Sequence, residues 1–179
     1  MLPERLAEAF GLLSGGRHIC ADDGDVFFDL QNRADDYARI FTALGFKMEH
    51  DGRGFFYFHG SAKGLASSTE RIALFMFILV DWLADRGEGI IDTLFGRDFV
   101  LDELPHLDVD RYRRYLREAG VDSKDELRDV IRKMANFGFI RSADGTRFRC
   151  LPPTHRLLDA SLALVEAFDE DDKEATHEE

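Results

Sequence analysis

The sequence predicts an α+β chain that is mostly helical and contains two similar modules. Two observations support this prediction: a capped amphipathic helix that leads into a hairpin signal, and a second copy of the same pattern earlier in the chain. The chain has 179 residues, enough for one ordinary domain or two small ones, and 45% of them are hydrophobic, enough for a packed core. The repeat favours two small modules.

The clearest pattern runs from Asp122 to Leu151. It opens with Ser123 and Glu126, whose spacing is that of a capping box at a helix N-terminus. Apolar residues then recur at helical spacing, at Leu127, Val130, Ile131 and Met134. Gly138 is expected to end the helix. Asp144-Gly145 lies between two strand-like runs, which is a strong signal for a β-hairpin.

The same pattern occurs 93 residues earlier without a gap. The first copy has its helical apolar stripe at Tyr37, Ile40, Phe41 and Leu44. The matched positions are Gly45 and Gly138, Phe46 and Phe139, Asp51 and Asp144, Gly52 and Gly145, and Phe55 and Phe148. Other positions differ: Ile40 falls opposite Lys133, and Arg53 falls opposite Thr146. We interpret the repeat as a structural duplication; two unrelated helix–hairpin units are the alternative.

A further helix is predicted over residues 109–119. The turn Gly120-Val-Asp122 joins it to the capped helix and has the length found in helix–turn–helix units. A helix, a short turn, a second helix and a hairpin follow one another in a winged helix. The expected fold is therefore α+β, mostly helical, with tandem winged-helix domains, each a helix–turn–helix followed by a β-hairpin wing.

The remaining elements follow from local patterns. A first helix has its apolar stripe at Leu6, Ala9, Phe10 and Leu13. Residues 17–20 are expected to be extended, residues 26–32 helical, and residues 154–168 a last helix. The turn Asp22–Asp25 carries three carboxylates, for which we expect a helix-capping role, since a calcium loop would also need a bidentate Glu at its end.

These elements give four expected segments. They are a first winged-helix domain at 1–64, a central buried helix and connector at 65–107, a second winged-helix domain at 108–168, and a disordered acidic tail at 169–179. The central helix is apolar nearly all round as far as Val80, which predicts burial in the chain's own core, between the modules or in a homodimer interface. Asp169–Glu179 has seven acids and one lysine, a composition typical of disorder.

Charge is distributed unevenly along the chain. The whole chain carries a formal net charge of −12, which argues against general nucleic-acid binding. Residues 111–149 nevertheless contain 11 Lys and Arg against 6 Asp and Glu. The candidate DNA-binding residues are Arg113, Arg114, Arg117, Lys124, Arg128, Arg132, Lys133, Arg141, Arg147 and Arg149. Such residues suit phosphate contacts with little sequence selectivity; a merely solvated face, or pairing with the acidic half of the chain, is the alternative.

Two aromatic stretches are candidates for partner binding. The strand-like run Phe55, Phe56, Tyr57 and Phe58 is apolar on both faces, so both faces should be covered. Either the chain itself or a partner could provide the cover. Phe75 and Phe77 belong to the over-apolar central helix, and we place them with the same partner-binding candidates.

Enzyme chemistry is not expected. The chain has no phosphate-binding Gly-rich loop with Lys and no Gly-x-Ser-x-Gly nucleophile turn. His50 and His59 could supply only two metal ligands, so we expect no metal and no cofactor. Cys20 and Cys150 should be free thiols in a cytoplasmic protein without a secretory signal. The longest apolar run, residues 72–80, is too short to span a membrane, which needs about 20 residues.

Three stretches carry a resemblance to a known family. They are Leu12–Cys20, residues 45–58 and Glu126–Leu151, together somewhat under half of the chain. With the tandem winged-helix pattern, the small size and the acidic balance, the chain resembles the kleisin-interacting tandem winged-helix proteins of bacterial condensins, the MksE/MukE-like subunits. None of the three stretches is a diagnostic motif.

The resemblance implies a non-catalytic accessory subunit of a bacterial SMC/condensin-type complex. Such a subunit is a homodimer that binds a kleisin of the MksF/MukF type and, through it, an SMC-type ATPase. The expected role is chromosome organisation and segregation or plasmid exclusion (plasmid defence), in the cytoplasm and associated with the nucleoid, with non-specific DNA contact in some members. The alternative from the residues alone is a dimeric winged-helix transcription regulator.

Overall fold

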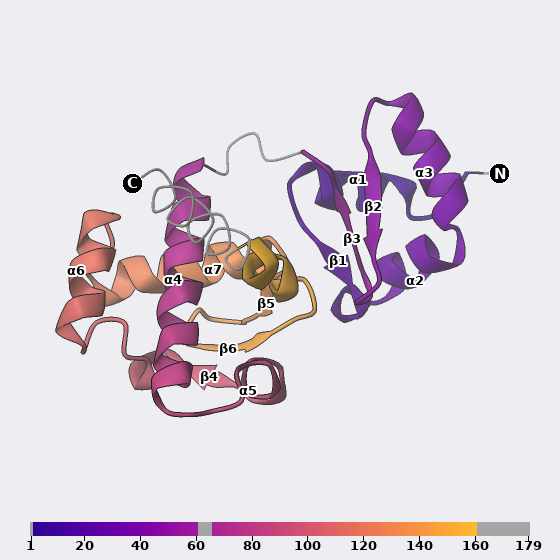
Figure 1. The fold of residues 1–179 in the computed structure, drawn as a ribbon. Helices are drawn as coiled ribbons and strands as arrows, with labels where there is room; N and C mark the ends of the chain where they lie inside the picture. Colours follow the sequence, from indigo (N-terminus) through magenta and orange to yellow (C-terminus); the bar gives the residue numbers. More distant parts are fainter. Residues whose placement is uncertain (1, 61–65, 161–179) are drawn as a thin grey trace, which may run out of the picture.

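The computed structural model describes residues 2–60 and 66–160, which form two modules side by side (Figure 1). Each module combines α-helices with one small three-stranded antiparallel sheet. The expected α+β, mostly helical class is therefore confirmed.

The first module occupies residues 2–60. Its elements in order are α1 (Leu6–Ser14), β1 (Ile19–Cys20), the short 3₁₀ helix η1 (Ala21–Asp23), α2 (Asp25–Asn32), α3 (Ala34–Ala43), β2 (Met48–Asp51) and β3 (Phe55–Phe58). The strands pair in the order β1-β3-β2, so the last strand is central. Each predicted helix of this part is present, and α2 begins one residue before the expected range 26–32.

One core holds the first module together. Ala9 and Leu13 of α1 and Tyr37 and Phe41 of α3 are fully buried and belong to one cluster with Phe56 of β3. The i, i+4 spacing of Tyr37 and Phe41 puts both rings on the inner face of α3. Leu44, predicted to belong to the same stripe, is instead exposed, because α3 ends at Ala43 and the chain turns away.

The second module occupies residues 66–160. Its elements in order are α4 (Ala66–Asp85), α5 (Ile90–Gly96), β4 (Phe99–Val100), the 3₁₀ helix η2 (Leu101–Glu103), α6 (Asp110–Glu118), α7 (Lys124–Asn136), β5 (Ile140–Arg141) and β6 (Arg147–Cys150). The strands pair in the order β4-β6-β5, which repeats the arrangement of the first sheet. Residues 66–107 thus contribute an edge strand to the same sheet as the hairpin.

α4 is the central helix of the second module. Ile72, Phe75 and Leu79 are buried and belong to one cluster with Leu116 of α6 and Met134 of α7. Figure 1 shows α4 crossing the whole module, with α6 and α7 against it. Because α6, α7 and the sheet surround much of α4, its unusually apolar surface is mostly explained by the chain's own core.

α7 has the start and the inner face that were predicted for it. The Glu126 backbone N–H donates to Ser123 Oγ at 3.3 Å, and the Ser123 N–H donates to the Glu126 carboxylate at 3.2 Å. Both halves of the capping box are therefore confirmed. All four predicted stripe residues, Leu127, Val130, Ile131 and Met134, are buried.

The two hairpins share their order but differ in their turns. In the first, Asp51 pairs with Phe55 and the left-handed residue is Gly54, whereas the repeat matches Gly52 to Gly145. In the second, Arg141 pairs with Arg149 and Gly145 is left-handed, as its Asp-Gly signal suggests. The longer second loop shifts the pairing register by two residues relative to the first hairpin.

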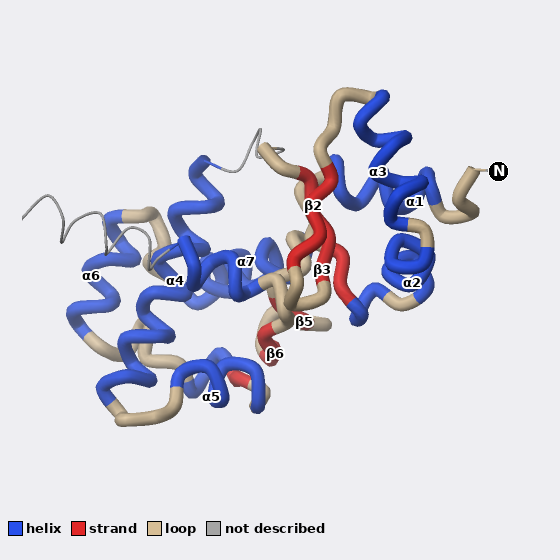
Figure 2. The backbone as a smooth tube through the Cα atoms, turned by 45° about the vertical axis from the view of Figure 1, so that its right-hand side comes forward, coloured by secondary structure: helices blue, strands red, loops and turns tan. Residues whose placement is uncertain are grey.

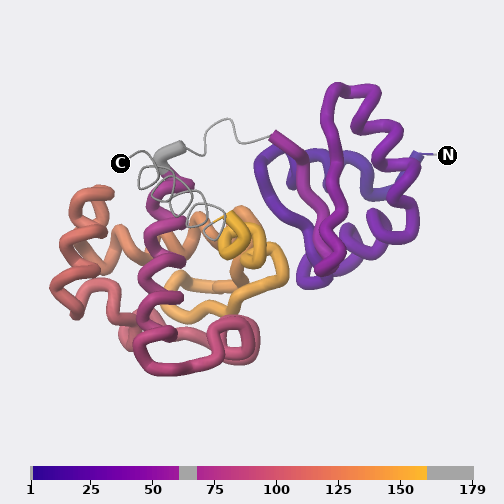
Figure 3. Tube along the Cα trace, in the orientation of Figure 1, coloured from indigo at the N-terminus to yellow at the C-terminus, as the bar shows by residue number. Residues whose placement is uncertain are grey.

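The described chain ends next to the first module. Residues from Thr154 to Ala160 are helical, in agreement with the predicted last helix, whose remainder lies outside the described residues together with the predicted tail 169–179. Figure 2 shows strands of both modules near the middle of the molecule and helices towards its two ends. Figure 3 shows residues 150–160, in yellow, returning to the boundary between the modules.

Candidate functional site: the basic face and the module junction

The ten basic candidates lie on three elements of the second module. α6 carries Arg113, Arg114 and Arg117; α7 carries Lys124, Arg128, Arg132 and Lys133; and the hairpin carries Arg141, Arg147 and Arg149. α6 and α7 follow each other through a short turn, and the hairpin folds back on α7. The structure therefore places all ten residues on one module. They differ in whether a carboxylate lies close enough to neutralise their charge.

Seven of the ten candidates are already paired with carboxylates. The pairs are Arg113–Asp110 at 3.7 Å, Lys124–Asp102 at 2.5 Å, Arg128–Asp125, Arg132–Asp129 at 3.0 Å, Arg141–Asp22 at 2.7 Å, Arg147–Asp98 at 3.9 Å and Arg149–Asp98 at 2.9 Å. Four of these acids, Asp22, Asp98, Asp102 and Asp110, lie outside the basic segment 111–149. The acidic part of the chain thus neutralises much of this segment.

Three candidates remain without a counter-ion. Arg114, Arg117 and Lys133 are exposed and have no carboxylate within ion-pair distance in the part of the chain that the structure describes. A phosphate could contact these side chains without first displacing an acid. They are therefore the most available members of the basic face.

The second hairpin packs closely on α7. A Cβ on Gly145 would lie 2.6 Å from Cγ of Arg128, and the residue has a positive φ of 75°. Ser142 Oγ donates to the Arg147 carbonyl at 2.6 Å and accepts the Gly145 N–H at 3.0 Å. Bonds from the Thr146 and Arg147 backbone N–H groups hold the pKa of the Asp144 carboxyl below its ordinary value. The loop is fixed by its own hydrogen bonds against the basic helix.

The structure buries most of the aromatic partner-binding candidates. Phe55, Phe56, Phe58 and Phe75 are buried inside the chain and cannot form a binding surface in this conformation. The two-sided cover expected for β3 is supplied by the chain itself. The first module's core lies on one side, with Phe56 and Phe58, and a small cluster with Leu151 lies on the other, with Phe55.

Phe77 is the aromatic candidate that remains on the outside. It lies on α4 and is 50% exposed. Tyr115 of α6 is also 40% exposed. α4 and α6 run antiparallel, because Tyr112 near the start of α6 donates to Asp81 at 2.7 Å and Arg71 donates to the Ala119 carbonyl at 2.9 Å. This direction places Tyr115 at about the level of Phe77 along the helix pair.

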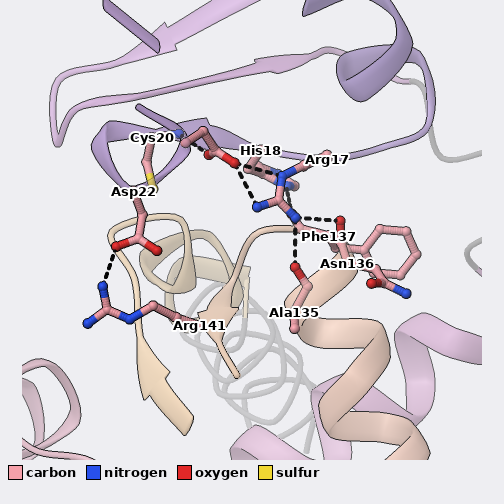
Figure 4. Close-up of polar contacts among 9 residues, drawn as sticks. Arg17, His18, Cys20, Asp22, Ala135, Asn136, Phe137 and Arg141 are labelled. Atoms are coloured by element: carbon pink, nitrogen blue, oxygen red, sulfur yellow. Dashed lines mark hydrogen bonds and ion pairs between the residues drawn. The ribbon is translucent and has the colours of Figure 1, made fainter. Parts of the chain in front are cut away.

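The C-terminal end of α7 is held by the first module (Figure 4). Arg17 Nη1 donates to the carbonyl oxygens of Ala135 at 2.8 Å and of Asn136 at 3.0 Å. The same guanidinium pairs with Asp23 at 2.7 Å, which fixes its position. A cation is favourable at a helix C-terminus, where the last carbonyls have no partner within the helix. Arg17 thus donates to carbonyls that have no hydrogen-bond donor within α7.

His18 continues this contact. Its backbone N–H donates to the Phe137 carbonyl at 2.9 Å, and its Nδ1 lies 3.0 Å from the same oxygen. The ring is 7% exposed, and burial lowers its pKa to about 4, helped by the nearby cations Arg156 and Arg17. The imidazole is therefore neutral at pH 7, with Nδ1–H donating and Nε2 accepting from Arg156 at 2.6 Å.

Glycine is required where the modules meet. Gly138 has a positive φ of 77°, and a Cβ there would overlap the His18 carbonyl oxygen. Beside it, Cys20 and Phe55 of the first module form a small apolar cluster with Leu151 of the second. Cys20 is a free thiol, as expected, and burial raises its pKa to about 11. The two backbones approach closely, and a few apolar side chains complete the contact.

A cavity of about 240 Å³ opens beside this contact. Its lining comes from both modules and includes His18, Tyr57, Ile72, Phe139 and Arg156. The Arg156 guanidinium lies 3.8 Å from the centre of the Tyr57 ring, in cation–π geometry. Tyr57, one of the partner-binding candidates, is therefore half-buried at the junction.

The sequence pointed to the basic residues but not to the junction. Local patterns predict only extended backbone at Arg17 and His18 and a helix end at Gly138, because the contacts of these residues join positions about 120 residues apart. The three carboxylates of the turn Asp22–Asp25 were a visible sequence feature close to the junction. Asp22 forms an ion pair with Arg141, and Asp23 forms one with Arg17. Asp23 also accepts a hydrogen bond from the Cys20 N–H at 2.9 Å.

Across residues 2–60 and 66–160, no three His, Cys, Asp or Glu side chains gather in a group that could hold a metal ion. The helices of these ranges include none with the length and apolar character needed to cross a bilayer.

Comparison with protein-family models gives a match. A search of the curated proteins found nothing similar to this chain. The family model described as "Condensin complex protein MksE" matches residues 4–162, which span both modules and the junction between them. This chain belongs to the MksE family of condensin complex proteins.

Proposed function

We propose that this chain is a non-catalytic accessory subunit of a bacterial SMC/condensin-type complex. It would bind a kleisin subunit of the MksF/MukF type and, through the kleisin, an SMC-type ATPase. The observation that carries this proposal is the family match over residues 4–162, which covers nearly all of the described chain. The complex would act on DNA in the cytoplasm, associated with the nucleoid, in chromosome organisation and segregation or in plasmid exclusion.

Each module is proposed to be a winged-helix domain. In both, a helix precedes an edge strand, two further helices follow, and a hairpin completes a sheet whose last strand is central. In this proposal the domains extend over residues 2–60 and 66–160, so the central helix α4 belongs to the second. The repeated order of elements and the repeated strand order support it.

The proposed protein-binding surface is the outer face of α4 and α6. Phe77 and Tyr115 are large, exposed and at the same level of the antiparallel pair. Aromatic residues of this kind are enriched at interfaces because they bury much area with little loss of side-chain freedom. A kleisin, or a second copy in a homodimer, would cover them.

DNA contact is proposed to be weak and independent of sequence. Arg114, Arg117 and Lys133 are the available cations, and phosphate contacts of this kind position a protein without reading bases. Three phosphate contacts give modest affinity that falls as salt is added. This suits a subunit whose complex supplies most of the DNA binding.

A dimeric transcription regulator is the alternative, and DNA selection separates the two functions. The purified chain is incubated with fragmented genomic DNA at several salt concentrations, and the retained fragments are sequenced. The accessory-subunit function predicts retention of fragments without a common site and its loss at physiological salt. Enrichment of one operator with nanomolar affinity would instead establish the regulator.

A further inference from the structure

Cations without an acidic partner are concentrated in the second module. Of the Lys and Arg side chains in residues 2–60 and 66–160, all but five lie within 4.0 Å of a carboxylate. The five exceptions are Arg71, Arg114, Arg117, Lys133 and Arg156, all in the second module. Two of the five, Arg71 and Arg156, are half-buried, whereas the others are exposed to water.

Arg71 is the half-buried cation with the fewer contacts. Arg156 donates to His18 Nε2 and lies over the Tyr57 ring. Arg71 forms a single hydrogen bond within the described ranges, from Nε to the Ala119 carbonyl at 2.9 Å. Its two Nη groups are strong donors without an acceptor in that part of the chain. Because burial removes water from a charged group, an external acceptor at these donors would be stabilised.

The turn between α6 and α7 holds the Arg71 guanidinium in place. Gly120 lies in this turn with a positive φ of 72°, and a Cβ there would lie 3.0 Å from Arg71 Nη2. Glycine therefore lets the guanidinium approach the turn closely, while the Nε bond to Ala119 fixes its plane. A guanidinium held in this way loses little side-chain freedom when it binds a further acceptor.

Arg71 lines a hollow of about 200 Å³ between α4 and α7. The α7 side of the hollow is lined by Glu126, Asp129, Val130, Arg132 and Lys133. Both acids have other partners: Glu126 accepts from the Ser123 N–H at the start of α7, and Asp129 pairs with Arg132 at 3.0 Å. Three cations thus line the hollow with two engaged carboxylates. Arg71 and Lys133 are the two lining cations that remain available to an anion.

We infer that this hollow binds one phosphate group, held by Arg71 from the α4 side and by Lys133 from the α7 side. A guanidinium edge can donate two parallel hydrogen bonds to phosphate oxygens, and an ammonium adds a compact positive charge. The phosphate can belong to a nucleic-acid backbone or to a free phosphorylated molecule. The nucleic-acid source rests on the proposed DNA contact, whereas the site itself does not.

NMR titration of the full chain with inorganic phosphate tests the site. Sodium chloride keeps the ionic strength constant, and the Arg71 Nε–H and Gly120 amide resonances are followed. Both should shift and saturate; shifts that never saturate would overturn the inference. Arg71→Gln should weaken phosphate binding on the order of tenfold, as expected for a lost hydrogen bond between charged groups. Arg86→Gln is the matched control, because Arg86 follows α4 and already pairs with Glu88 at 2.7 Å.

Lys133→Gln gives a second test that does not disturb a described contact. Lys133 is exposed and has no ion pair or hydrogen bond among residues 2–60 and 66–160. The Arg71 Nε–H resonance should still shift, but on the order of tenfold more phosphate should be needed. Equal phosphate affinity in this variant and in the wild type would overturn the assignment of Lys133 to the site.

A random DNA duplex distinguishes the two sources of phosphate. If the backbone enters the hollow, the duplex shifts the same resonances, and Arg71→Gln weakens duplex binding at low salt whereas Arg86→Gln does not. Saturable phosphate binding with no duplex binding would support the site, assign it to a free phosphorylated molecule and contradict the proposed DNA contact. Duplex binding without saturable phosphate binding would overturn the site and leave the DNA contact in place.

Discussion

At the scale of single residues, Gly138 and Gly45 form a natural matched pair. Both have positive φ and occupy equivalent places in the repeat, but a Cβ on Gly45 meets nothing within 4 Å, whereas one on Gly138 overlaps the His18 carbonyl. Gly45→Ala should lower the free energy of unfolding by about 1 kcal/mol through backbone strain alone. Gly138→Ala should lose about 2 kcal/mol more through the clash. Equal losses in urea unfolding would contradict the close approach of the modules.

His18 predicts a pH dependence that can be isolated by one substitution. Its folded pKa of about 4 lies below the ordinary 6.5, so the unfolded chain takes up the proton first as the pH falls. The contribution to stability is complete above pH 6.5 and is lost between pH 6.5 and 4. From pH 7 to 5, the wild type should lose roughly 2 kcal/mol more than His18→Asn.

The comparison is made by denaturant unfolding at both pH values. Other groups that titrate in this range, including the buried His106, are present in both proteins and cancel. If both proteins lose the same amount, His18 does not impose the predicted penalty on the folded state.

Contacts between residues close in the sequence could be predicted from the sequence, whereas contacts between distant residues could not. Ser123 and Glu126 fix each other within one helical turn, so the sequence alone identifies the cap. Phe55 and Phe58 signal cover on both faces of β3, yet nothing local distinguishes the chain's own core from a partner. The Arg17 contact with Ala135 joins residues 118 positions apart, and no sequence pattern links them.

At the scale of elements, the link between Arg17 and the end of α7 should hold the modules in one orientation. Arg17→Ala removes two hydrogen bonds to carbonyls and the pair with Asp23. Interfaces between domains are small and polar compared with cores, so the modules should move apart without unfolding. The radius of gyration in small-angle X-ray scattering should rise, while far-UV circular dichroism should not change.

Arg5→Ala is the control for this experiment. Arg5 also forms two ion pairs, with Glu8 and Asp25, but both lie inside the first module. An equal rise in the radius of gyration for both variants would show that Arg17 has no special role at the junction.

The basic face offers two triple variants that remove the same charge. Arg114, Arg117 and Lys133 have no carboxylate partner in the described ranges, whereas Lys124, Arg128 and Arg132 are each paired. Changing the first three to Gln should flatten the salt dependence of DNA binding by about 3 units of slope, one for each lost phosphate contact. Changing the second three should have a smaller effect.

Fluorescence anisotropy on a random duplex gives the slope of log K against log salt for each variant. If the two triple variants weaken DNA binding equally, net charge alone governs the binding. The distinction between paired and available cations would then be wrong.

The repeated hairpin shows how far an element can be predicted. The offset of 93 residues correctly gave the order helix, glycine, strand, turn and strand in both copies. It did not give the register, because the turn chemistry differs. Gly54 supplies the left-handed residue of a short first loop, and Ser142 ties a longer second loop with two hydrogen bonds. The pairing register of each hairpin therefore depends on the length of its turn, which the matched residues do not reveal.

At the scale of the whole molecule, the uneven charge has a structural explanation that the sequence left open. Asp22, Asp98, Asp102 and Asp110 come from outside the basic segment and pair with five of the ten candidate cations. Net charge counts such acids but cannot say which cations they meet. The fold leaves a smaller set of available cations than the ten predicted, and all of them are on the second module.

The exposed aromatic pair predicts where a protein partner binds. Phe77→Asp should reduce recovery of partner proteins at least tenfold, since truncating a central interface aromatic loses about 2 kcal/mol or more. Phe28→Asp is the matched control, because Phe28 is 51% exposed but lies on the first module. Both variants should keep the wild-type melting temperature. Loss of the partner with Phe28→Asp alone would move the interface to the first module.

Membership of a condensin complex is tested most directly by affinity capture of the full-length tagged chain from its native cells. One half of the lysate is treated with nuclease and the other half is not. The proteins retained from each half are identified and quantified by mass spectrometry. The account predicts a kleisin and a long coiled-coil SMC-type ATPase at constant ratios to the chain, with and without nuclease. Recovery of the chain alone, or only with a discrete DNA fragment that nuclease removes, would contradict it.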